Sequence, residues 1–176
     1  MPEQVDEIFG IGAKRKFGKQ DVEVFLTDFR VPTLVLIKQI AKSHQPVIVI
    51  NGHNKLSPDT VRRAITTGLK EIGASVKPKY VVSNAGLSKL YKDLDKSNIV
   101  IKTIVTSAER VAGIQAQLKG LQKDGIGKDV QIVVHKDQSD KAIKALQNKD
   151  IKQMRKYLGK NITGMFNQIR GELRHA

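Results

Sequence analysis

The chain has 176 residues, no cysteine and no tryptophan, and its 31 Lys and Arg side chains against 17 Asp and Glu give a net charge of +14. This length suits one domain or two small ones, and the lack of cysteine excludes disulfides, thiolate metal sites and cysteine nucleophiles. The charge favours an anionic partner, with nucleic acid ranked before an acidic protein or a membrane surface. No apolar run approaches the roughly 20 residues that span a bilayer, and no signal peptide or lipidation motif is visible. We therefore expect a cytoplasmic protein, associated with the nucleoid or with RNA, and no membrane partner.

Residues 1–20 are predicted to form a flexible basic arm. Glycines at positions 10, 12 and 18 favour flexibility, and the positive charge comes from Lys14, Arg15, Lys16 and Lys19. In one interpretation this arm wraps around phosphates, and in the other it is a solvated leader without a binding role.

Residues 21–140 are predicted to form an α/β core in which strands and helices alternate. Strand-like apolar segments occur at residues 22–29, 47–50, 75–82, 98–105 and 130–135. Pro78 places the third of these at an edge or a bulge, because proline cannot donate to a strand ladder. A helix begins near Arg30 and ends before Pro46, and others are expected over 58–72 and 107–123. The segments that begin at Lys19 and Lys96 look alike, so a duplicated βαβα unit is one explanation and two unrelated βα units are the other.

The prediction is centred on one strand–loop–helix unit, residues 46–73. The β-branched run 47–50 indicates a strand buried on both faces, and Ser57 followed by Pro58 marks a helix start. An apolar stripe along this helix leaves five polar side chains on its outer face: Arg62, Arg63, Thr66, Thr67 and Lys70. We expect the helix N-terminus and this outer face to meet anions; the alternative is an ordinary βα unit with a solvated face.

Residues 141–176 are predicted to form a basic helical C-terminal extension with a break at Gly159. This segment holds nine Lys or Arg against Asp150 and Glu172, which leaves a charge of +7. Its basic cluster is formed by Lys152, Arg155, Lys156 and Lys160.

Signatures of catalysis are sparse, so we expect a protein that is not an enzyme and that needs no metal or cofactor. The four histidines are scattered without metal-ligand spacing, and no Walker, Rossmann or Gly-x-Ser-x-Gly motif is present. One alternative is a phosphate- or nucleotide-processing enzyme. In it, Asp28, His53 and Asp137 meet at the carboxyl edge of the sheet, where open α/β sheets bind ligands.

The order of elements from Val22 to Val105 resembles the Alba family of chromatin and RNA-binding proteins. The pieces that carry the resemblance are the sequence Asp28-Phe29-Arg30-Val31-Pro32, the loop 51–55 and the basic connection 83–97. It implies a βαβαββ fold, a homodimer, and duplex DNA held by the first loop and a basic β-hairpin. In this sequence Arg30 stands in place of the family's lysine pair, and the last 70 residues lie outside the resemblance.

Our leading hypothesis is a non-enzymatic protein that binds duplex DNA or structured RNA through backbone phosphates. Aromatic residues are only 5% of the chain, which disfavours a base-stacking platform for single strands. The expected contacts are the basic residues Lys14, Arg15, Lys16, Arg30, Lys55, Arg62, Arg63, Lys89, Lys92, Arg155 and Lys156. The other alternative is a scaffold or assembly protein whose basic surface binds an acidic protein.

Overall fold

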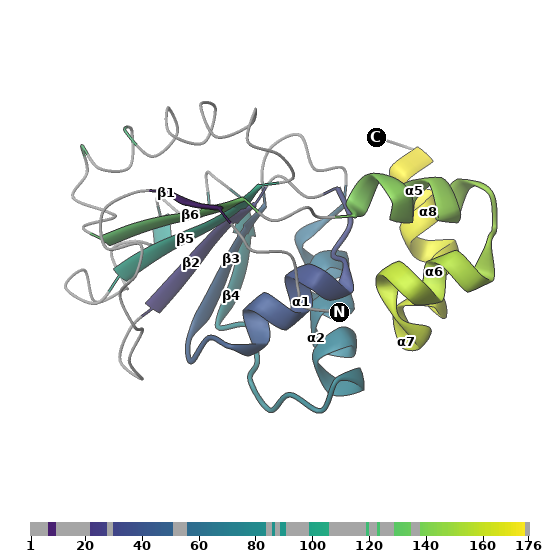
Figure 1. Ribbon diagram of the computed structural model, residues 1–176, viewed down its shortest axis with the longest axis horizontal. Coiled ribbons are helices and arrows are strands. Elements are labelled where there is room, and N and C mark those ends of the chain that lie inside the picture. The colour runs from purple at the N-terminus through teal and green to yellow at the C-terminus, as the bar shows by residue number, and fades with distance from the viewer. Residues whose placement is uncertain are drawn as a thin grey trace.

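A computed structural model describes residues 7–9, 22–27, 30–50, 56–83, 86, 89–90, 99–105, 119, 123, 129–134 and 138–174. Within these ranges six strands form one sheet in the order β1-β6-β5-β2-β3-β4 (Figure 1). The strands are β1 (Glu7–Phe9), β2 (Val22–Thr27), β3 (Pro46–Ile50), β4 (Tyr80–Ser83), β5 (Ile99–Val105) and β6 (Asp129–Val134). All neighbours are parallel except β1, which is antiparallel to β6. This arrangement confirms the predicted α/β class.

The sheet is wound in two directions from its centre. The chain passes from β2 to β3 and β4 on one side, then returns to place β5 and β6 on the other side of β2. Phe25 in β2 therefore lies opposite both Ile48 in β3 and Lys102 in β5. The two similar segments, which begin at Lys19 and Lys96, contain β2 and β5, and these strands are neighbours in the middle of the sheet.

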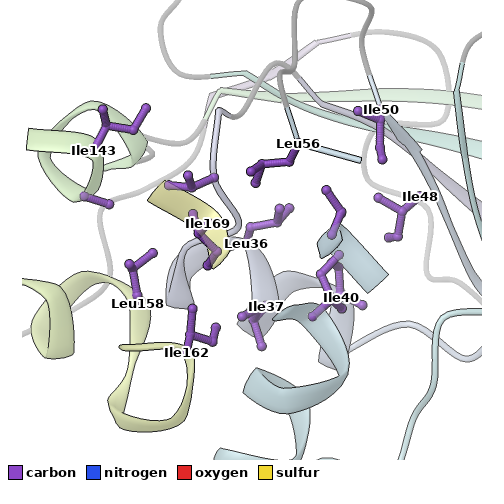
Figure 2. Packing of buried hydrophobic residues seen from close by; sticks show 14 of the residues in the cluster. Leu36, Ile37, Ile40, Ile48, Ile50, Leu56, Ile143, Leu158, Ile162 and Ile169 are labelled. Carbon is purple, nitrogen blue, oxygen red and sulfur yellow. The ribbon is translucent and has the colours of Figure 1, made fainter. Parts of the chain in front are cut away.

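Strand β3 lies in the centre of the packed core. All five of its residues are buried, and because side chains alternate along a strand, both faces of β3 are covered. Ile48 and Ile50 belong to the main hydrophobic cluster (Figure 2). The unbroken β-branched run in the sequence is therefore explained, as predicted, by burial on two sides.

Helices α1 (Leu34–Ala41) and α2 (Pro58–Glu71) pack on this cluster. The side chain of Ser57 accepts a hydrogen bond from the Thr60 backbone N–H, and Pro58 occupies the first turn of α2, as the sequence predicted. The helix ends at Glu71, and Gly73, two residues later, has a φ of 76° in the left-handed region. The backbone N–H groups of Gly73 and Ala74 donate to carbonyls of the last turn, which satisfies groups that a helix end otherwise leaves unpaired.

Four C-terminal helices form a further layer on the side of α1 and α2 that faces away from the sheet (Figure 1). They are α5 (Ser139–Gln147), α6 (Ile151–Leu158), α7 (Lys160–Thr163) and α8 (Phe166–Arg174). Met154, Leu158, Ile162 and Ile169 are fully buried, and they belong to the same cluster as Ile48 (Figure 2). Burial of each such side chain stabilises the fold by about 1.5–3 kcal/mol, so these helices share the core of the α/β unit.

Two glycines allow this layer to approach closely. A Cβ at Gly68 in α2 would overlap Ile37 of α1 and come within 3.2 Å of Ile162 of α7. Gly159 joins α6 to α7 at a φ of 92°, and a Cβ there would overlap the carboxylate of Glu71. The break predicted at Gly159 is therefore a tight, left-handed junction that lies against the end of α2.

Two details differ from the sequence predictions. Glu7–Phe9 form the edge strand β1, although residues 1–20 were expected to be a flexible arm; the paired strand β6 supplies the hydrogen bonds that so short a segment lacks alone. The strand predicted over 75–82 begins only at Tyr80, because Pro78 has no N–H to donate, and β4 pairs with β3 alone, as expected of an edge. Of the predicted helix 107–123, only Lys119 and Lys123 are described, and both are helical.

Gly159→Ala is expected to destabilise the protein, because alanine is strained at this φ and its Cβ would displace Glu71. The backbone strain alone costs about 1–3 kcal/mol, measured as the loss in free energy of unfolding in urea. Gly171→Ala is the control, since that helical glycine has open space around it and alanine there should gain up to about 1 kcal/mol. Equal stability of the two variants would contradict the close approach at Gly159.

Candidate nucleic-acid interface

The N-terminus of α2 is occupied by a carboxylate from the C-terminal layer. Glu172 of α8 accepts hydrogen bonds from the Ser57 backbone N–H at 3.3 Å and from the Thr60 hydroxyl at 2.5 Å. The Ser57 hydroxyl donates to the same carboxylate at 3.1 Å. The sequence predicted that this helix end meets an anion, and in the structure the chain supplies that anion itself.

A second carboxylate, Glu71, connects the other end of α2 to α7. Its Oε1 accepts from the backbone N–H groups of Lys160 at 2.7 Å and Asn161 at 3.2 Å. These are N–H groups of the first turn of α7, which have no partner within their own helix. Glu71 and Glu172 are thus both engaged with helix ends and not with the arginines and lysines around them.

The basic side chains on α2 and α6 form no ion pairs with the residues that the structure describes. Arg63 and Lys70 are exposed on α2, as are Arg155 and Lys156 on α6, and Arg62 is half-buried. None of these five lies within ion-pair distance of a carboxylate in the described part of the chain. Arg30 differs, because its Nη1 lies 4.0 Å from Asp140 Oδ1. Within the described residues, the positive side chains on α2 and α6 are therefore not paired with carboxylates.

Arg62 and Arg63 border an open hollow between α2 and the junction of α7 with α8. The hollow encloses about 540 Å³. Its lining residues come from both elements: Arg62, Arg63, Thr66 and Thr67 from α2, and Asn161, Gly164 and Met165 from the junction. The outer face that the sequence assigned to α2 is thus one wall of a site whose other wall lies about 100 residues later in the chain.

The guanidinium of Arg63 is held in place by a neutral side chain. Its Nη1 donates to Gln168 Oε1 of α8 at 2.7 Å, and Gln168 Nε2 donates to the Thr60 hydroxyl oxygen at 3.3 Å. Thr60 in turn donates to Glu172. Residues 168 and 172 lie one turn apart on α8. They contact residues 60 and 63 of α2 and its N-cap, Ser57, so a row of polar contacts joins the two helices.

A second, smaller hollow of about 260 Å³ lies between α5 and α8. Arg30 and Arg170 line it together with Ile143, Leu146, Gln147 and Leu173. Arg170 also lies over the ring of Phe166, at 5.6 Å from the centroid. Arg30, predicted as a contact of the first loop, therefore belongs to this second hollow and not to the one beside Arg62 and Arg63.

The predicted contact residues are only partly brought together. Arg155, Lys156 and the exposed Lys89 line neither of the two hollows. Five predicted contacts lie outside the described residues: Lys14, Arg15, Lys16, Lys55 and Lys92. The same holds for the alternative catalytic set of Asp28, His53 and Asp137. Sequence reasoning missed Asn161, Met165 and Gln168, because no local pattern shows which distant helix packs beside α2.

No family model, curated protein or solved structure matches this chain. In the described part, no group of three or more His, Cys, Asp or Glu side chains could hold a metal ion. The helices that can be described there are all too short or too polar to cross a bilayer.

The strand order bears on the Alba-like arrangement. The resemblance implies a basic β-hairpin built on the connection 83–97. In the structure β4 pairs only with β3, whereas β5 pairs with β2 and β6. Because β4 and β5 are not neighbours, that connection does not join the two arms of a hairpin, and this implied feature is wrong.

Glu172→Ala is expected to loosen the contact between α8 and α2. The change leaves the Ser57 N–H and the Thr60 hydroxyl without their acceptor, and hydrogen bonds to a charged group are worth about 1.5–3 kcal/mol. Asp59→Ala is the control, because Asp59 is an exposed acid in the first turn of α2. Its interaction with the dipole of α2 is worth only about 0.3–1 kcal/mol. Urea unfolding should show a clearly larger loss for Glu172→Ala; an equal or smaller loss would contradict the clamp.

Proposed function

We propose that this protein binds nucleic acid through backbone phosphates, without catalysis and with little reading of base sequence. The observation that carries the proposal is the set of cations on α2 and α6 that have no carboxylate within ion-pair distance among the described residues. Glu172 at the start of α2 and Glu71 at its end are engaged with helix ends. The two carboxylates therefore do not pair with the arginines and lysines, which are left to attract a polyanion.

The magnitude of the charge supports the same proposal. A net +14 attracts phosphates over a wide area, and each phosphate that is neutralised releases counterions from the nucleic acid. Few aromatic rings are available to stack bases, which favours contacts to the backbone of duplex DNA or structured RNA. The proposal does not depend on the Alba-like pattern or on its implied homodimer.

The hollow between α5 and α8 favours a second candidate, binding of an acidic protein. Arg30 and Arg170 lie beside apolar side chains there, a combination suited to an acidic residue next to an apolar one. Such a scaffold protein would use the same basic surface without affinity for nucleic acid. The enzymatic alternative rests on residues outside the described part of the chain and gains no support from the hollows.

Binding to labelled duplex DNA and structured RNA, followed by fluorescence anisotropy, is expected to weaken steeply with salt. If about six phosphates are neutralised, the logarithm of affinity should fall with the logarithm of salt concentration at a slope near −5. Absence of binding at low salt for both ligands, and for single-stranded DNA, would overturn the proposal and leave the acidic-protein candidate.

Replacement of Arg62 and Arg63 together by Ala is expected to reduce affinity by about tenfold or more. Each lost phosphate contact should also make the salt slope shallower by about 1. The matched control is Lys42→Ala with Lys77→Ala, which removes two exposed charges that line neither hollow. All duplex sequences should be affected alike. Loss restricted to one sequence, or an equal loss in the control, would contradict backbone binding at α2.

A further inference from the structure

The hollow beside Arg62 and Arg63 combines charge with hydrogen-bonding groups. Along α2, Arg62 lies one turn before Thr66, and Arg63 lies one turn before Thr67, so cations and hydroxyls alternate on one helix face. Asn161 faces them from α7, and all five line the same open space of about 540 Å³. Guanidinium, hydroxyl and amide groups are the usual protein partners of phosphate oxygens.

Arg63 is oriented without being neutralised. Its partner, Gln168, presents a carbonyl oxygen at 2.7 Å, and that amide is fixed in turn by the hydroxyl of Thr60 at 3.3 Å. A guanidinium has five N–H donors, and this contact engages Nη1 alone. A carboxylate at position 168 would hold the arginine equally well but would cancel its charge. The neutral amide therefore keeps Arg63 both positioned and cationic, as an anion site requires.

We propose that this hollow grips a single phosphate group of the nucleic-acid backbone, and that the C-terminal helices build part of the site. Arg62 and Arg63 provide the charge, whereas Thr66, Thr67 and Asn161 provide hydrogen bonds. Gln168 is a positioning residue, since it acts through Arg63. The inference rests on the proposed function and deepens it, because α7 and α8 then supply a hydrogen-bonding side chain and the residue that positions Arg63, as well as positive charge.

The deciding experiment compares two substitutions that change the net charge equally at adjacent positions of α8. Gln168→Glu places a carboxylate against Arg63, whereas Asn167→Asp places one on a neighbouring exposed residue that does not line the hollow. Anisotropy with labelled duplex DNA measures the affinity, and thermal unfolding checks that both variants fold. We expect Gln168→Glu to weaken binding about tenfold, as the loss of one charged hydrogen-bonded contact implies. Asn167→Asp should change affinity by about twofold or less.

A double-mutant cycle separates positioning from charge. In a protein that already carries Arg63→Ala, Gln168→Glu should have no more effect than Asn167→Asp, because its target is gone. Gln168→Met removes the acceptor of the Arg63 guanidinium without adding charge, and it should weaken binding by a smaller factor of about three. This variant replaces Gln168→Glu in the test if the glutamate variant folds poorly.

The outcomes distinguish this inference from the function on which it rests. If the unmodified protein binds duplex DNA but Gln168→Glu and Asn167→Asp weaken it equally, only net charge matters and the composite site is wrong. An undiminished effect of Gln168→Glu in the Arg63→Ala protein would also overturn it. If the unmodified protein binds no nucleic acid, the proposed function fails first.

Discussion

The arrangement of this protein depends on two carboxylates that join helix ends across layers. Glu172 of α8 occupies the start of α2, and Glu71 at the end of α2 occupies the start of α7. Helix N-termini carry a partial positive charge and unpaired N–H groups. Each carboxylate interacts favourably with that charge and accepts hydrogen bonds at the helix end. Helix α2 is thereby fixed at both ends against the C-terminal layer, while its apolar stripe packs toward the sheet.

This clamp also shapes the surface charge. In many proteins an acidic side chain near an arginine forms a surface ion pair, which is worth little in stability. Here Glu172 and Glu71, at the two ends of α2, accept from backbone N–H groups and, for Glu172, also from the hydroxyls of Ser57 and Thr60. The same two contacts that hold the layers together therefore leave the outer face of α2 cationic. The contacts of Glu71 and Glu172 thus both stabilise the packing of the layers and preserve the positive potential on the outer face of α2.

Local chemistry made much of the fold predictable. The β-branched run 47–50 becomes β3, Ser57 and Pro58 begin α2, and Gly159 breaks the C-terminal helices, because each signal acts over a few neighbouring residues. The strand order was not predictable, since nothing local specifies that β5 lies beside β2. Strand β1 was missed for a similar reason: three residues carry too little pattern, and pairing with β6, more than 120 positions away, creates the strand.

The candidate site divides in the same way. The polar face of α2 was visible from helical spacing, so Arg62, Arg63, Thr66 and Thr67 were found. Gln168 and Asn161 were not, because their roles arise from packing between helices more than 90 residues apart. The position of Arg30 beside Arg170 was not visible from the sequence either, since Arg170 comes from α8.

The shared core has a consequence for biogenesis. Ile162 and Ile169 cover apolar side chains of the α/β unit, yet they are among the last parts of the described chain to leave the ribosome. Domains fold as units during synthesis, and exposed apolar surface promotes aggregation. One side of the nascent α/β unit therefore stays uncovered until α8 has emerged from the ribosome. The C-terminal wall of the hollow beside Arg62 and Arg63 likewise forms only after α7 and α8 have been synthesised.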